Sequence, residues 1–408
     1  MIAANIDFSQ EYQLKLFDIT KSWVFNINGT KIGVVGYTTP YTMQTAFTKN
    51  LLFTDEIHAI KLESEILHSA GIKTIIALGH SGFQTDLKIA REVPLVDLVI
   101  GGHTNTFLWN GPLDEWPEKS KGSYPTIVEQ PNGKRVPVVQ AYAFTKYMGR
   151  LTVIINSDGE IIDSYGLPQL LNFTVPQDVG ALNLLEKYRP ALQKLDKVIV
   201  GHSVNKLAGE ASECKRHKCT LGNLITDAFV AYYKNEYNQN TIGMISTRTL
   251  YHDVVPKSDG SISMLDLLNA LPYGGKVYSV SVTGADIWKT LEIGVSQNPH
   301  GTGAEFIHTS GIQYVYNTSR PLGNRIVQVK VGCDYCVKLK YQNIVFEKIY
   351  RVTVSEMLYK GLDFQTVIKE NSFDVVQENK SELDIILWYL KKVSLVNNTV
   401  DDRIISLI

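Results

Sequence analysis

Two histidines, His80 and His103, stand in nearly the same local sequence, 23 positions apart. Each follows an apolar run and at least one glycine. A histidine binds a metal ion when its ring is neutral and held through its second nitrogen or its backbone, and a neighbouring glycine lets backbone and substrate come close. The alternative is that each is a hydrogen-bonded loop histidine. Spacing alone does not choose, because a dinuclear site usually adds carboxylates.

The elements around these histidines follow an alternating pattern. Apolar β-branched runs predict buried strands, and apolar residues at helical spacing predict helices between them. Such alternation is typical of an α/β fold with a mostly parallel sheet, in which ligands bind at the carboxyl ends of strands. Both histidines come at those ends. The predicted strands are 31–39, 73–80 and 96–103, and the predicted helices are 55–70, ended by Gly71, and 86–93.

The rest of the chain divides at a helical segment. Residues 136–162 alternate like antiparallel strands with a turn at 156–159. Residues 177–199 read as a linker helix, which we expect Pro190 to interrupt. The predicted domains are therefore 1–176 and 200–408, with helices at 221–234 and near 284–295 in the second.

The composition bounds the class of protein. The 408 residues are 44% hydrophobic and 20% charged, which is typical of globular chains and leaves room for about two or three domains. A net charge of −1 argues against nucleic acid or an anionic membrane surface as the main partner. No apolar run reaches the roughly 18 residues of a membrane span. The first residues, MIAANIDFSQ, lack the pattern of a signal peptide.

The cysteines form two close pairs, Cys214 with Cys219 and Cys333 with Cys336. CDYC at 333–336 is a candidate redox motif or zinc half-site, but zinc usually takes four ligands and the two pairs are 114 positions apart. We prefer two local disulfides, which would indicate an oxidising compartment. Five glycosylation sequons agree with an extracellular location, although a long chain holds some by chance. They begin at Asn28, Asn172, Asn317, Asn379 and Asn397.

The stretch ALGHSGF through VIGGHTNTFL resembles the signature of the 5'-nucleotidase and apyrase family, whose members hydrolyse extracellular nucleotides. The similarity continues in YPTIVEQPNGKRVPVVQAYAFTKYMGRL, CKRHKCTLGNLITDA and LPYGGKVYSVSVTG. It implies a calcineurin-like metallophosphoesterase α/β sandwich, here partial, then a linker helix and an α+β nucleotide-binding C-terminal domain. It also implies both disulfides, Cys214–Cys219 and Cys333–Cys336.

The resemblance gives roles to three residues of the first domain. His80 and His103 match the last two histidine ligands of a site for two divalent metals, typically zinc, and Asn105 matches a residue that contacts phosphate. The family's other ligands and its catalytic histidine come before the segment matched by residues 3–6. We therefore expect an N-terminally truncated chain with half a metal site, no catalytic residue and no useful hydrolysis.

The second domain matches the family's nucleotide site less well. Tyr273 and Phe364 fall on the two aromatic rings that stack on the base. Lys215 stands where the family has a phosphate-binding arginine. Lysine lacks the two-pronged guanidinium group with which arginine binds phosphate through two hydrogen bonds. Ser246 and Tyr251 replace an asparagine and an arginine of the substrate site, and Arg248 is an alternative for that arginine.

Two functions remain open from the sequence. The first is a secreted 5'-nucleotidase or apyrase whose N-terminal third is missing from this chain. The second is a non-catalytic secreted relative that binds nucleotides, nucleosides or a host protein. Homodimers are common in the family, so a homodimer is a further expectation.

Overall fold

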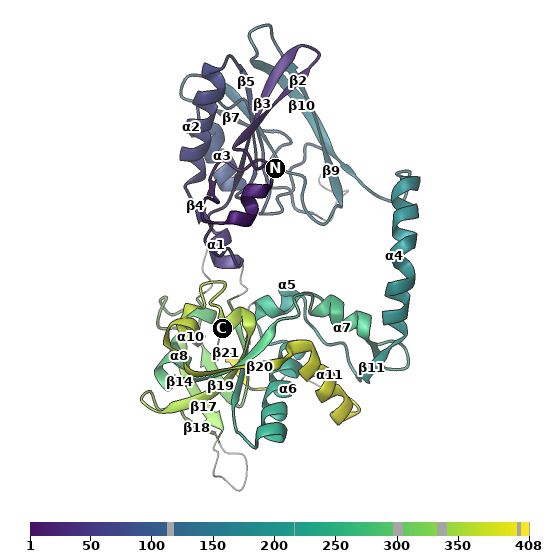
Figure 1. Ribbon diagram of the computed structural model, residues 1–408, viewed down its shortest axis with the longest axis vertical. Helices are drawn as coiled ribbons and strands as arrows, with labels where there is room; N and C mark the ends of the chain where they lie inside the picture. Colours follow the sequence, from purple (N-terminus) through teal and green to yellow (C-terminus); the bar gives the residue numbers. More distant parts are fainter. Residues whose placement is uncertain (112–117, 216, 297–304, 333–340, 398–400, 408) are drawn as a thin grey trace. The chain divides into compact units, whose positions relative to one another are not determined.

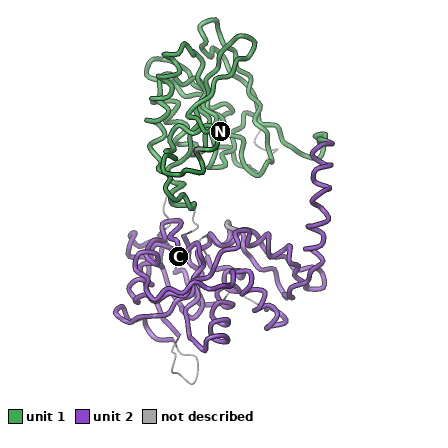
Figure 2. Tube along the Cα trace, in the orientation of Figure 1, with its two compact units in different colours: residues 1–178 green, residues 179–408 purple. Residues whose placement is uncertain are grey.

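The computed structural model describes residues 1–111, 118–215, 217–296, 305–332, 341–397 and 401–407. The chain divides into two units, Met1–Asp178 (unit 1) and Val179–Ile408 (unit 2), which Figure 2 distinguishes by colour. Cys333 and Cys336 lie outside the described residues. No helix in the described parts of the chain is long and apolar enough to cross a membrane.

A six-stranded sheet organises unit 1, in the order β2-β3-β5-β6-β8-β7 (Figure 1). The four inner strands run parallel, and the two edge strands run antiparallel to their neighbours. The predicted strands are β3, β5 and β6, as the apolar runs indicated. The bounds are β2 Ser22–Ile27, β3 Thr30–Thr38, β5 Thr74–His80, β6 Leu98–Ile100, β7 Thr126–Glu129 and β8 Arg135–Val139.

Two helices cover this sheet and build its core. The helix α2 (Glu56–Ser69) packs against β3, and α3 (Phe83–Glu92) packs against β6 and β8. Asp55 caps α2 by accepting a hydrogen bond from the His58 amide at 2.8 Å. The helix α3 begins three residues before the predicted start, because the chain turns at Gly82, whose φ is +95°.

A hairpin and a long helix complete the connection between the halves. The strands β9 (Tyr147–Ile155) and β10 (Ile161–Leu170) pair antiparallel across a turn at 156–160. The helix α4 (Val179–Lys197) runs through Pro190, so the predicted interruption is wrong. No residue of α4 is buried. Water can therefore satisfy the carbonyl that proline leaves without a donor, and the helix tolerates the residue.

Unit 2 has α+β architecture with two hydrophobic cores. Its central sheet has the order β15-β12-β19-β14-β20, and a four-stranded sheet has the order β18-β17-β16-β21. One core gathers around α6 and α11, and the other gathers around α8 and both sheets.

The bounds of these elements are β12 Ile242–Ser246, β14 Lys276–Thr283, β15 Ile307–Ser310, β16 Ile312–Tyr316, β17 Ile326–Gly332, β18 Tyr341–Asn343, β19 Ile349–Ser355, β20 Phe373–Ser381, β21 Ile404–Ser406, α6 Thr220–Tyr237, α8 Gly284–Gly294 and α11 Glu382–Val393. The helix α6 contains the predicted helix 221–234 and extends one residue before it and three after it, and α8 begins where the second was predicted and ends one residue earlier.

Candidate functional site

His80 and His103 lie side by side at one edge of the parallel sheet. His80 is the last residue of β5, and His103 comes three residues after β6 ends. Their ring centroids are 5.1 Å apart, with the ring planes at 72°. Burial, and then the neighbouring His80, lower the pKa of His103. A ring that stays neutral keeps the lone pair that a metal ion requires.

Close packing around the histidines explains the glycines beside them. A Cβ at Gly102 would lie 2.8 Å from Nδ1 of His80, and a Cβ at Gly101 would lie 1.9 Å from Oδ2 of Asp86. His103 and Asn105 adopt left-handed φ angles of 77° and 53°. Non-glycine residues adopt this region rarely, and such strain gathers at ligand sites. The loop is thus held in one conformation by its surroundings.

A buried polar network braces this loop. The Tyr37 hydroxyl donates to Oδ1 of Asp86 at 2.8 Å, and Nε2 of Gln140 donates to Oδ2 at 2.6 Å and to the Gly102 carbonyl at 3.0 Å. Oε1 of Gln140 accepts from the Thr106 amide at 3.1 Å. Burial raises the pKa of Asp86 to about 6, and the two side-chain hydrogen bonds only partly offset it. The sequence reasoning missed Asp86 and Gln140.

The described residues fit only part of a metal site. Two imidazole nitrogens are suitable ligands for a divalent cation. Within the described ranges, no third Cys, His, Asp or Glu side chain joins His80 and His103 in a ligand cluster. Asp86 already accepts the hydrogen bonds of Tyr37 and Gln140. The described chain therefore offers two ligands at this position rather than a full set.

Asn105 borders a cavity of about 860 Å³ that carries lysines. Three lysines and one glutamate line it, a formal charge of +2 (3 − 1). Glu118 forms an ion pair with Lys146 and accepts a hydrogen bond from the Tyr147 hydroxyl at 2.7 Å. Lys119 and Lys121 are exposed, and their charge favours an anion beside Asn105. The sequence reasoning missed these lysines, which lie in a loop with no motif.

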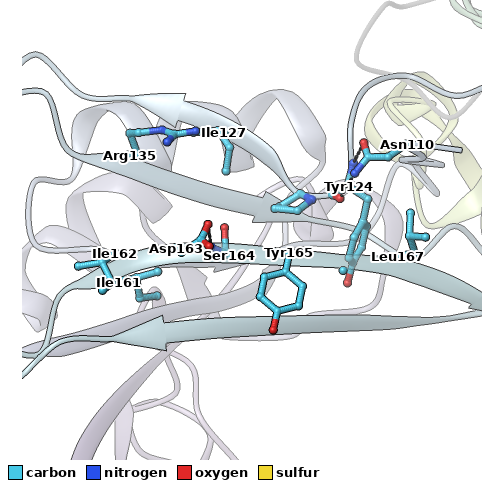
Figure 3. A pocket seen from close by; sticks show the side chains of 12 residues that line it. Asn110, Tyr124, Ile127, Arg135, Ile161, Ile162, Asp163, Ser164, Tyr165 and Leu167 are labelled. Atoms are coloured by element: carbon cyan, nitrogen blue, oxygen red, sulfur yellow. Dashed lines mark hydrogen bonds between the residues drawn. The ribbon is translucent and has the colours of Figure 1, made fainter.

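A second hollow of unit 1, of about 420 Å³, contains none of the predicted site residues. Figure 3 shows Ile127 and Arg135 on one side of it and the β10 residues from Ile161 to Leu167 on the other. Its lining is mostly apolar, and Asn110 is engaged with the backbone of Tyr124. The groups there do not converge as reacting groups of a site would.

In unit 2, the two predicted aromatic residues lie on loops. Tyr273 precedes β14 and is 48% exposed. Phe364 is half-buried with a φ of 65°, next to the fully buried Asp363. Nε of Arg248 lies 3.8 Å from Oδ2 of Asp363, so this arginine is tied to the Phe364 loop.

Ser246 and Tyr251, the other two positions at which the sequence departs from the family's substrate site, differ in exposure. Ser246 is 2% exposed at the end of β12, and Tyr251 is 47% exposed. The ring of Tyr251 contacts His252, with centroids 4.7 Å apart. Of the three positions, Arg248 alone makes a described ion pair with the Phe364 segment.

The structure contains the predicted Cys214–Cys219 disulfide, which closes the segment that carries Lys215. His308 lies beside it and is fully buried. Burial lowers the pKa of His308 to about 3, so the ring is neutral at physiological pH. The sequence reasoning missed this histidine, because it lies on the apolar strand β15, far along the chain from the cysteines.

Comparison with known proteins defines the class. Residues 199–370 match the family described as 5'-nucleotidase, C-terminal domain. The chain is 34% identical over 415 residues to Protein 5NUC of Lutzomyia longipalpis, covering 99% of this chain and 72% of that protein. It is 34% identical over 414 residues to a 5'-nucleotidase of Diplobatis ommata, covering 99% of this chain and 71% of that protein.

A solved structure agrees with these relatives. The crystal structure of a 5'-nucleotidase precursor from Thermus thermophilus has a TM-score of 0.84 and 30% identity, covering 100% of this chain and 78% of that one. The chain belongs to the 5'-nucleotidase family. The family and the fold class predicted from the motifs are confirmed.

Proposed function

We propose that this chain binds nucleoside phosphates, with a divalent cation, zinc by preference, at His80 and His103. The observation that carries the proposal is the contact between these two rings at the carboxyl ends of adjacent parallel strands. Asn105 and the lysine-bearing cavity beside it supply neutral and cationic donors for phosphate oxygens. Zinc suits imidazole ligands.

Unit 2 by itself carries a second set of candidate nucleotide-binding groups. The exposed Tyr273 ring and the Phe364 ring offer faces on which a base can stack, worth about 1–3 kcal/mol per ring. Lys215 and Arg248 are candidate cations for phosphate. Both keep a positive charge, although Arg248 already pairs with Asp363. Stacking tolerates different bases, so we expect weak discrimination among them.

Binding should exceed hydrolysis for residues 1–408. A bound cation would polarise a phosphoryl oxygen. The described part of the chain supplies two imidazoles for that cation, and we assign no general acid for the leaving oxygen. Independently of the metal site, the replacements at Lys215, Ser246 and Tyr251 weaken the contacts that unit 2 can make to phosphate. These substitutions favour a non-catalytic relative over an efficient hydrolase.

An extracellular location is part of the proposal. A buried disulfide persists in oxidising compartments. Four of the five sequon asparagines, at Asn28, Asn172, Asn379 and Asn397, are exposed and accessible to glycosylation. One relative, 36% identical over 389 residues, is a snake venom 5'-nucleotidase of Macrovipera lebetinus.

Calorimetric titration with AMP, with and without Zn²⁺, tests the proposal. We expect zinc to strengthen AMP binding and the variant His80→Ala/His103→Ala to abolish that gain. His68→Ala, which removes an exposed histidine of α2, is the matched control and should behave as wild type. Phosphate release from AMP should stay near background. Rapid release would overturn the non-catalytic interpretation, and no heat with either AMP or adenosine would leave a protein-binding role.

A further inference from the structure

The Cys214–Cys219 disulfide has a third side chain of metal-ligand type beside it. Sγ of Cys219 lies 3.8 Å from Nε2 and 4.0 Å from Nδ1 of His308. One ligand atom from each of the three side chains falls within 4.8 Å of the others. In the part of the chain that the structure describes, no other three Cys, His, Asp or Glu side chains gather this closely. Two sulfurs and one imidazole are a ligand set typical of zinc.

The surroundings hold His308 in place. Cys214, Cys219 and His308 are 0%, 2% and 0% exposed. A Cβ at Gly222 would lie 2.5 Å from Cγ of His308, so α6 packs directly on the ring. The Thr247 hydroxyl lies 3.2 Å from Nε2 of His308 and donates to the Cys214 carbonyl at 3.0 Å. Such outer contacts orient a histidine ligand.

We propose that the reduced chain binds Zn²⁺ through Cys214, Cys219 and His308, so that a metal cross-link replaces the disulfide. A phosphine reductant breaks the S–S bond: phosphorus gives up two electrons and takes oxygen from water, and the two sulfurs take the two protons. Zn²⁺ then displaces both thiol protons and binds two thiolates and one ring nitrogen.

The consequence concerns the segment that carries Lys215. The disulfide joins two Cα atoms 5.4 Å apart and so closes a short loop. A cation held by the same sulfurs keeps those ends together after reduction. Lys215 would then stay in place under reducing conditions. The inference goes beyond nucleotide binding and does not depend on it, because none of the three ligands is among the proposed nucleotide contacts.

Co²⁺ is a suitable probe, because thiolate ligation gives it a charge-transfer absorption. The full chain should carry His80→Ala, His103→Ala, Cys333→Ser and Cys336→Ser, so that no other predicted site contributes. We expect the phosphine-reduced protein to bind one Co²⁺ with thiolate absorption and the oxidised protein to show none. Zinc should bleach the band. His308→Gln should weaken Co²⁺ binding at least about tenfold, and Cys219→Ser should remove the absorption.

The Cys333→Ser/Cys336→Ser chain, which keeps all three proposed ligands, supplies a second test. Zinc should raise the melting temperature of the reduced protein and leave that of the oxidised protein less changed. Equal Co²⁺ absorption in the reduced and oxidised forms, or unchanged affinity in His308→Gln, would overturn the proposal. Failure of the oxidised wild-type chain to bind AMP, with the cobalt band retained in the reduced variant, would overturn the proposed function alone.

Discussion

The two units hold their candidate residues in opposite ways. In unit 1, His103 lies on a strained loop beside His80, the last residue of β5, and the buried carboxylate of Asp86 braces that loop through Gln140. In unit 2, Tyr273 lies on an exposed loop next to the filled core of β14. Packing and binding are therefore coupled in unit 1, where a change that moves the loop also moves the ligands. In unit 2 the two properties should separate.

Within the sheets, the contrast in burial lies between edge strands and inner strands. The edge strand β2 of unit 1 leaves Trp23 and Phe25 57% and 49% exposed, and β10 leaves Tyr165 57% exposed. All five residues of the unit 2 strand β12 are buried, as are the six inner residues of β14. Burial of apolar surface stabilises by about 25 cal/mol per Å². We therefore expect substitutions in inner strands, such as β8 of unit 1 and β14 of unit 2, to cost more stability than substitutions in β2 or β10.

The largest expected effect is that of Gly101→Ala. The new Cβ would lie 1.9 Å from Oδ2 of Asp86, which Tyr37 and Gln140 prevent from moving away. We expect the free energy of unfolding of unit 1 to fall by about 3 kcal/mol and zinc binding to be lost. Hydrogen exchange resolved by peptide would locate the change. The backbone amides of unit 2 should exchange as slowly as in the wild type.

Gly71→Ala is the control for this substitution. Gly71 has open space around it and a φ of +82°, so alanine there adds backbone strain without a clash. We expect the free energy of unfolding to fall by about 1 kcal/mol and zinc binding to be retained. Equal losses at the two glycines would show that the Asp86 network does not brace the loop.

A smaller effect is expected in unit 2 from Glu382→Gln. Burial raises the pKa of Glu382 from 4.5 to about 8, and Oε1 has no hydrogen-bond partner in the structure. Because the folded pKa is the higher one, its contribution to stability is complete below pH 4.5 and is lost as pH rises through 8. Glutamine removes this charge. At alkaline pH, the free energy of unfolding of the variant should exceed that of the wild type by on the order of 1–3 kcal/mol.

Chemical denaturation between about pH 5 and pH 9 would check this expectation. Glu236→Gln, an exposed glutamate at the end of α6, is the matched control and should leave the pH slope unchanged. Parallel slopes in wild type and Glu382→Gln would mean that Glu382 does not titrate in the folded protein.

Residues in regular local patterns were predictable, and long-range contacts were not. The pair His80 and His103 came together as predicted because consecutive parallel strands end at the same edge of a sheet. Asp86 was missed because a polar residue in a short amphipathic helix reads as solvent-facing, and its partner Gln140 lies 54 positions away. Arg248 pairs with Asp363, 115 positions away, and no local pattern announces such a contact.

Tyr273→Ala should change stability least and therefore tests the separation expected in unit 2. The ring is 48% exposed, so its loss should change the free energy of unfolding by less than about 1 kcal/mol. Adenosine affinity should fall about tenfold, because one stacking face is lost. Tyr188→Ala, at a 63% exposed tyrosine of α4, should change neither quantity. Calorimetric titration measures the affinity, and thermal denaturation measures the stability. A large fall in melting temperature with unchanged adenosine affinity would mean that Tyr273 stabilises the fold and does not stack on the base. The separation of packing from binding expected in unit 2 would then be wrong.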